Sequence, residues 1–191
     1  MKIHLSALCA ICLMAATAAM ADTIERWSGT SDITFSGTST LHNWQGTVKA
    51  NSFTSSVTRD GSGQPSRVQA TVVVEATQMD TAEPKRDENM KKAMKVGDFP
   101  LITGLIDAPF ALISASGSTP VKLPIKLKLL DTEQDVTGVV SNWKLEGKNA
   151  SFDLDFDVSM KASGIKVPAV LLFIRVGDTV KVHATVTLTQ S

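Results

Sequence analysis

One alternating stretch constrains the fold more than any other part of the sequence: Ser151 to Met160 reads S-F-D-L-D-F-D-V-S-M. Large apolar residues occupy every second position, so the period is two rather than the 3.6 residues of a helix. The segment is predicted to be a β-strand that faces a core on one side and presents three aspartates to water on the other. Because parallel sheets are covered on both faces, this pattern favours an antiparallel sheet.

The same period of two recurs along the rest of the chain. Counted by runs and turns, the segments make about eight strands. Two short candidates come first, Ile24 to Ser28 and Ile33 to Gly37, and seven longer segments follow: Gln45 to Val57, Val68 to Ala76, Leu101 to Ile113, Val121 to Leu129, Val136 to Glu146, Ser151 to Met160 and Val180 to Leu188. The pattern predicts an all-β domain, either a packed sandwich or an eight-stranded antiparallel barrel whose interior can hold one small ligand.

A single short helix interrupts the strands at mid-chain. Within Arg86 to Val96, residues Met90, Ala93 and Met94 follow the i, i+3, i+4 spacing of one helix face, and Gly97 is placed as a C-terminal cap. This helix is predicted to be a lid or plug at one end of the sheet.

The N-terminal segment has the features of a secretory signal. Lys2 is followed by an apolar run from Leu5 to Ala16 and by the small-residue cleavage site Ala19-Met20-Ala21. The apolar run is too short for a membrane span. The sequence therefore predicts a signal peptide over residues 1–21 and an exported single domain over residues 22–191.

Composition excludes several classes of site. Both cysteines, Cys9 and Cys12, lie in the predicted signal, so disulfides, thiol nucleophiles and cysteine-ligated metals are not expected. Since Lys2 is the one charged residue of the signal, its removal leaves 18 basic and 19 acidic residues, a formal net charge of −1. Without a basic run, nucleic acid is not an expected partner.

Four segments resemble one known family when they are taken together and in order. They are G-T-S-T-L-H-N-W at Gly37 to Trp44, R-D-E-N-M-K-K-A-M-K at Arg86 to Lys95 with D-F-P-L-I at Asp98 to Ile102, G-I-K-V-P at Gly164 to Pro168, and the following V-G-D-T-V-K-V. This set is similar to that of the YceI-like family of periplasmic polyisoprenoid-binding proteins, over essentially all of residues 22–191. The resemblance implies a lipocalin-like barrel with one short mid-chain helix and a long apolar tunnel for an isoprenoid or other long-chain lipid.

The inward side chains are the candidate ligand contacts. If the barrel is open inside they line its tunnel, and if it is packed they form an ordinary core. The candidates are Phe35, Trp44, Val72, Val74, Met90, Met94, Phe99, Phe110, Leu127, Trp143, Phe152 and Phe156.

The candidate headgroup contacts are His42 and Arg86, each with a structural alternative. For His42 the alternative is a hydrogen bond within its turn. For Arg86 it is an ion pair at the surface or at the barrel mouth. His183 lies on the polar phase of its strand, where plain exposure is expected.

The charged and nucleophilic residues do not suggest catalysis. With His42 and His183 as the two histidines beyond the signal, a three-histidine metal site is impossible. A Ser-His-Asp triad could use Ser39 and His42, but no nucleophile-elbow pattern surrounds either residue. We therefore expect a periplasmic lipid carrier, monomeric or homodimeric, without metal, enzyme activity or cofactor other than the lipid. The alternatives are an interaction partner of a membrane redox or stress system and, less favoured, a lipid-ester hydrolase.

Overall fold

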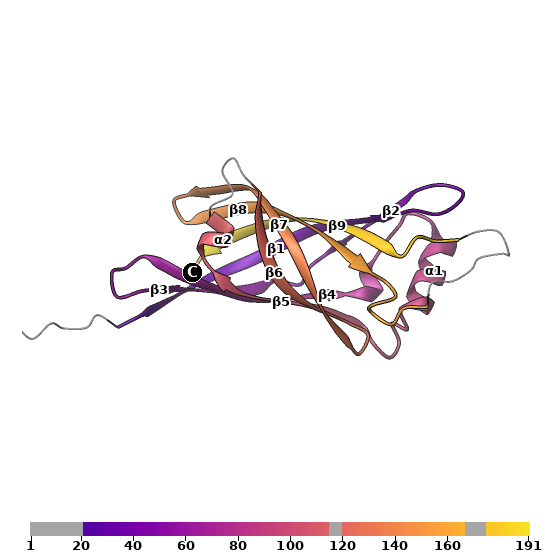
Figure 1. The fold of residues 1–191 in the computed structure, drawn as a ribbon, viewed down its shortest axis with the longest axis horizontal. Helices are drawn as coiled ribbons and strands as arrows, with labels where there is room; N and C mark the ends of the chain where they lie inside the picture. The colour runs from indigo at the N-terminus through magenta and orange to yellow at the C-terminus, as the bar shows by residue number, and fades with distance from the viewer. Residues whose placement is uncertain (1–20, 115–119, 167–174) are drawn as a thin grey trace, which may run out of the picture.

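A computed structural model describes residues 21–114, 120–166 and 175–191, and in these ranges the chain is mostly β-sheet (Figure 1). Nine strands are formed: β1 (Thr23–Gly37), β2 (Trp44–Lys49), β3 (Phe53–Arg59), β4 (Pro65–Glu75), β5 (Leu101–Pro109), β6 (Val121–Leu129), β7 (Thr132–Glu146), β8 (Asn149–Ser159) and β9 (Thr179–Gln190). The helices are η1 (Ala76–Gln78), α1 (Pro84–Ala93) and α2 (Ala111–Ser114).

The strands close into an eight-stranded antiparallel barrel with one extra strand. The order runs from β1 through β3 and the following strands to β9, and β9 pairs back with β1 from Trp27↔Gln190 to Ser36↔Lys181. The extra strand, β2, pairs with the second half of β1, and β3 pairs with the first half. The predicted barrel is thus confirmed, and the sandwich alternative is excluded.

The N-terminal strands differ from the sequence-based expectation in two ways. The segment expected as two short strands is the single strand β1 of 15 residues. Gly29 does not break it, because its missing side chain leaves room for the ring of Phe53. The segment expected as one strand over Gln45 to Val57 is divided between β2 and β3, which share one edge of β1.

The alternation of the central strands is confirmed. On β8, Phe152, Leu154 and Val158 are buried while Asp155 and Asp157 are exposed. On β6, every second residue from Leu123 to Leu129 is buried, and the intervening residues are exposed. Each barrel wall therefore presents apolar side chains to a common interior.

The helical segments also depart slightly from expectation. The predicted helix Arg86 to Val96 is α1, which begins at Pro84 and ends at Ala93, with Glu83 as the N-cap. The strand expected to reach Ile113 ends at Pro109. The Phe110 carbonyl then accepts hydrogen bonds from the Ile113 and Ser114 amides and starts α2. Among the described residues, no helix has the length and hydropathy needed to cross a membrane.

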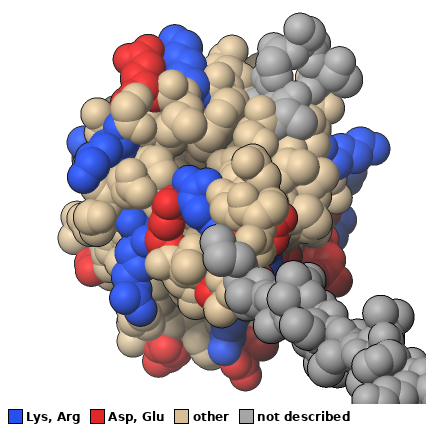
Figure 2. Space-filling model, turned by 90° about the vertical axis from the view of Figure 1, so that its left-hand side faces the viewer, with Lys and Arg blue, Asp and Glu red and all other residues tan. Residues whose placement is uncertain are grey.

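The barrel interior is filled solidly at one end. Near α2, Trp143 packs edge-on against Phe110, with ring centroids 5.9 Å apart, and also contacts Phe152 at 6.0 Å. Phe152 belongs to a large buried apolar cluster that includes Trp27 and Leu123, and the partly buried Phe110 and Trp143 pack against this cluster. Figure 2 views the molecule from this end, where basic and acidic side chains alternate around the rim without a patch of one sign.

Candidate functional site: an apolar cavity beneath the helix

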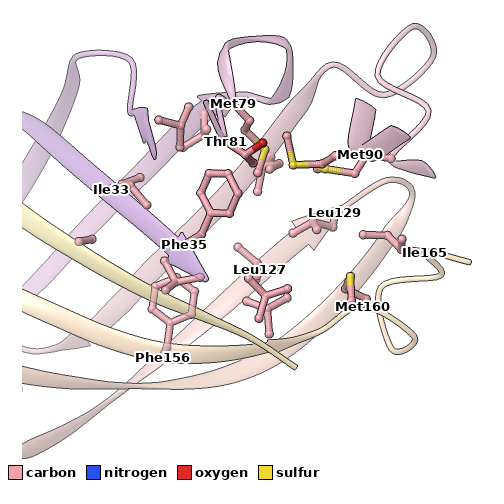
Figure 3. A pocket seen from close by; sticks show the side chains of 18 of the residues that line it. Ile33, Phe35, Met79, Thr81, Met90, Leu127, Leu129, Phe156, Met160 and Ile165 are labelled. Carbon is pink, nitrogen blue, oxygen red and sulfur yellow. The ribbon is translucent and has the colours of Figure 1, made fainter. Parts of the chain in front are cut away.

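The half of the barrel nearest α1 is hollow. It contains a cavity of about 470 Å³, bordered by α1 and by residues of β1, β2, β4, β5, β6, β8 and β9 (Figure 3). This volume lies within the range of about 300 to 1,000 Å³ typical of small-molecule sites. The labelled side chains in Figure 3 present carbon and sulfur apart from the hydroxyl of Thr81. The arrangement is suited to burying an apolar molecule.

The cavity walls are the inward rows of the strands. Ile33 and Phe35 enter from β1, Leu127 from β6 and Phe156 from β8, and Figure 3 shows them projecting into one space. The alternation that the sequence shows is the cause, since every second residue of a barrel strand points inward. Trp44 of β2 packs edge-on to Phe35 with ring centroids 6.3 Å apart, which extends the wall toward the mouth.

The floor of the cavity is the near surface of the packed end. Leu154, Ile125 and Ile106 belong both to the cavity lining and to the large apolar cluster behind it. Gly138 leaves the space that the Leu154 side chain occupies in the floor, because a Cβ at position 138 would lie 2.5 Å from Leu154 Cδ1. The cavity is therefore blind in the direction of α2.

The roof of the cavity is the apolar side of α1 and the segment around it. Met90, Ala93 and Met94 all border the cavity, as their spacing on one helix face requires. Met94 is 8% exposed, whereas Met90 is partly buried. Met79 and Met160 add two further flexible thioethers to the lining near this end.

A buried threonine fastens the first turn of α1. Thr81 is 5% exposed, and its hydroxyl oxygen accepts a hydrogen bond from Arg86 Nε at 2.9 Å while donating to Asp87 Oδ1 at 2.5 Å. The Thr81 amide donates to the same carboxylate oxygen at 2.9 Å. These hydrogen bonds, that of the hydroxyl above all, hold the pKa of Asp87 below its usual value. Arg86 thus contacts Thr81, in place of the ion pair weighed from the sequence.

The β1–β2 turn forms one side of the mouth. Ser39 Oγ donates to the His42 carbonyl at 2.7 Å and accepts from the His42 amide at 3.3 Å. The backbone of His42 therefore makes the turn hydrogen bonds expected from the sequence, and the residue also borders the cavity. The turn is joined to the segment before β9 by a bridge between Ser39 and Val176.

The predicted ligand contacts divide between the cavity and the packed core. Eight of the residues border the cavity: Phe35, Trp44, Val72, Val74, Met90, Met94, Leu127 and Phe156. The two headgroup candidates, His42 and Arg86, border its mouth. Phe110, Trp143 and Phe152 lie in the packed end, and Phe99 lies in the turn before β5, so these four are not part of the lining.

Several lining residues were missed by the sequence analysis. They are mostly aliphatic and include Ile33, Val48, Ile102, Ile125, Leu129, Leu154, Val158, Ile165, Val180 and Val182. Apart from Ile165, which follows β8, their strand phase marks them as inward, but the same phase marks residues of the packed end. Height along the barrel axis separates the two groups, and it depends on the register between strands rather than on any local pattern.

The outer face of β8 and β9 carries a polar network. His183 Nδ1 lies 2.8 Å from Asp155 Oδ1, so His183 has a partner where plain exposure was expected. Asp153 accepts hydrogen bonds from Asn142 at 2.7 Å and from Thr185 at 3.0 Å, and the first of these is the main cause of its lowered pKa. Within the ranges that the structure describes, no group of three or more histidine, cysteine or acidic residues is arranged to hold a metal ion.

Comparisons with known proteins agree on the fold. The model of the YceI-like domain family matches residues 27–188. The crystal structure of BcnA from Burkholderia cenocepacia superposes with a TM-score of 0.63 at 14% identity, covering 82% of this chain and 95% of that one. A polyisoprenoid binding domain from Saccharophagus degradans, implicated in plant cell wall breakdown, has a TM-score of 0.60 at 11% identity, covering 86% and 98%. No curated protein sequence matches this chain significantly.

Proposed function

The chain belongs to the YceI-like domain family, and on that premise we propose that it is a periplasmic carrier for one long-chain apolar lipid. The ligand is an isoprenoid quinone, a polyprenyl lipid or a similar amphiphile, held inside the barrel. The observation that supports this proposal best is the blind apolar cavity of about 470 Å³ beneath α1. The Saccharophagus domain, which shares the fold and is described as polyisoprenoid binding, points to the same class of ligand.

Transfer of apolar surface from water supplies the affinity. Each buried methylene contributes about 0.8 kcal/mol, so a chain of ten carbons gains about 8 kcal/mol before the costs of association and chain ordering. The walls contribute through contact area, and no buried charge is needed. Met79, Met90 and Met160 let the lining adapt to chains of different shape.

A binding role is favoured over the two alternatives. An interaction protein whose interior is packed does not account for the cavity. A lipid-ester hydrolase needs an activated nucleophile beside the bound ester. The Ser39 hydroxyl at the mouth is engaged by the backbone of His42 instead. A membrane redox system remains a candidate partner that would deliver or receive the lipid.

Solvent extraction of the purified protein followed by mass spectrometry tests the carrier proposal. Protein taken from the periplasm without detergent should release a long-chain lipid in near-stoichiometric amount. An unrelated exported protein purified by the same route controls for adventitious lipid. Equal lipid from both proteins would count against the proposal.

Export rests on the N-terminal segment, of which residues 1–20 lie outside the described residues. We propose cleavage after Ala21, because the small-residue site ends there. The intact mass of periplasmic protein should then correspond to a chain that begins at Asp22. A mass that includes Met1 would contradict cleavage.

A further inference from the structure

We infer that the floor of the cavity limits the length of ligand tail that the barrel can bury. The limit is about fifteen chain carbons. The inference rests on the proposed function and specifies its ligand class, a single-chain amphiphile whose tail ends at the floor of the cavity. In liquid water each molecule takes up roughly 30 Å³, and a methylene group in a liquid hydrocarbon takes up about as much. A cavity of about 470 Å³ is therefore filled by about fifteen carbons, which corresponds to three isoprene units or to about fifteen carbons of a long acyl chain.

The floor is rigid enough to set that limit. Leu154 and Ile125 close the cavity, and both lie against Gly138, where a Cβ would be 2.5 Å from Leu154 Cδ1 and 3.0 Å from Ile125 Cδ1. Behind them stand the packed rings of Trp143 and Phe152. A longer tail would have to separate side chains packed at the density of a protein interior, so it extends out of the mouth instead.

The polar groups of the lining fix which end of the ligand is buried. Ser39, His42, Thr81, Glu83, Arg86 and Asn89 all belong to the mouth turn or to α1 and the residues before it. At the other end, Ser31 borders the cavity; its hydroxyl oxygen is buried in the wall and has no hydrogen-bond partner among the described residues, so the surface that the floor exposes to a ligand is carbon. A polar head left at the mouth keeps its hydrogen bonds, whereas at the floor it would lose them.

A series of linear 1-alkanols from eight to twenty carbons tests the limit. Their affinities are measured by displacement of the fluorescent probe N-phenyl-1-naphthylamine from the full-length mature protein. Affinity should rise about fourfold per carbon, the equivalent of about 0.8 kcal/mol per methylene, and should level off near fifteen carbons. Affinity that climbs steadily to twenty carbons would overturn the length limit while leaving the carrier function intact.

Two floor variants move the limit in opposite directions. Leu154 and Ala184 are cross-strand partners on β8 and β9, and both border the cavity. Leu154→Ala removes three carbons from the floor. The levelling point, meaning the alkanol length at which affinity stops rising, should therefore move about three carbons higher. Ala184→Leu adds three carbons and should lower it by a similar amount. Because Leu154→Ala removes packing contacts in the core, Leu154→Val serves as a milder variant, for which the levelling point should move by about one carbon.

The outcomes separate the inference from the function on which it rests. A levelling point that stays unchanged in the folded floor variants overturns the length limit alone. If no alkanol displaces the probe from the wild-type protein, the proposed function fails and the length limit fails with it. Thermal unfolding of each variant verifies that it is folded before its affinities are compared.

Discussion

Arg86 and Thr81 are joined by two hydrogen bonds, from Arg86 Nε to Thr81 Oγ1 at 2.9 Å and from Arg86 Nη2 to the Thr81 carbonyl at 2.7 Å. The same threonine donates to Asp87 through its hydroxyl and its amide. One buried residue thus links the segment after η1 to two consecutive residues of α1. A ten-residue helix is marginal by itself, so these contacts and the apolar side of the helix keep it over the cavity.

Thr81→Val should loosen α1 while the barrel stays folded. The valine keeps the volume but leaves Arg86 Nε and the Asp87 carboxylate without their hydroxyl partner, a loss of about 1 to 3 kcal/mol. Amide hydrogen exchange should accelerate in α1 more than in the strands. Thr187→Val is the matched control, because Thr187 is exposed on β9. Similar exchange in α1 for the two variants would contradict the anchoring role of Thr81.

Asp87 makes the attachment of α1 sensitive to acid. Its pKa is lowered in the folded protein, first by the hydrogen bond from Thr81. The folded state therefore binds this proton less readily than the unfolded chain, and the stabilisation is fully present above pH 3.8, the ordinary pKa of an aspartate side chain. It is lost as the pH falls below that value through the folded pKa.

Asp87→Asn isolates this contribution from those of the other carboxylates. Denaturant unfolding at several pH values between 2 and 6 should show a smaller acid-induced loss of stability for the variant than for the wild type. Asp131→Asn, at an exposed position between β6 and β7, is a suitable control. Parallel stability curves for wild type and Asp87→Asn would contradict the assignment.

Met90 and Met94 share one side of α1 but should respond differently to truncation. Met94 is 8% exposed and packs with Leu127 and Leu129, so Met94→Ala should lower the free energy of unfolding by about 2 to 4 kcal/mol. Met90 is partly buried and faces the cavity. Met90→Ala should therefore weaken alkanol binding severalfold with a smaller loss of stability. If Met90→Ala binds alkanols normally, Met90 is part of a plug rather than a ligand contact.

The two faces of β8 give a direct test of register. Phe156→Asp places an unpaired carboxylate in the cavity wall, and we expect a loss of more than about 3 kcal/mol or complete unfolding. Asp155→Ala removes an exposed contact with His183 and should change stability by less than about 1 kcal/mol. Chemical denaturation measures both. Equal effects would show that the faces are assigned incorrectly.

The fold was largely predictable because the alternation of apolar and polar residues is a local pattern that can be seen within each strand. The alternation from Ser151 to Met160 and from Val121 to Leu129 directly records which face is buried. The boundaries were less predictable in β1, where Gly29 indicates a break but instead accommodates Phe53. That contact joins β1 to a strand about two dozen residues later, so no local pattern contains it.

The site was predictable only in part. Inward phase identified Phe35 and Phe156 as cavity residues, but it identified Phe152 equally well, and that residue lies in the packed end. The attachment of Arg86 to Thr81 was not predicted, because it depends on how the chain turns between η1 and α1. Ala82 has a φ of 57° in that turn, a conformation that alanine rarely adopts and that sequence patterns do not indicate.

Filling the cavity from its wall tests the central claim most directly. Gly104 on β5 borders the cavity, a Cβ built there meets no atom within 4 Å, and its φ lies outside the left-handed range. Gly104→Leu should therefore occupy part of the cavity, with thermal stability equal to or above that of the wild type. Thr103→Leu, on the other face of the same strand, is the control. The decisive measurement is the dissociation constant of 1-tetradecanol by probe displacement. We predict that Gly104→Leu raises it at least tenfold while Thr103→Leu leaves it nearly unchanged, whereas a folded Gly104→Leu that binds as tightly as the wild type would contradict lipid binding in this cavity.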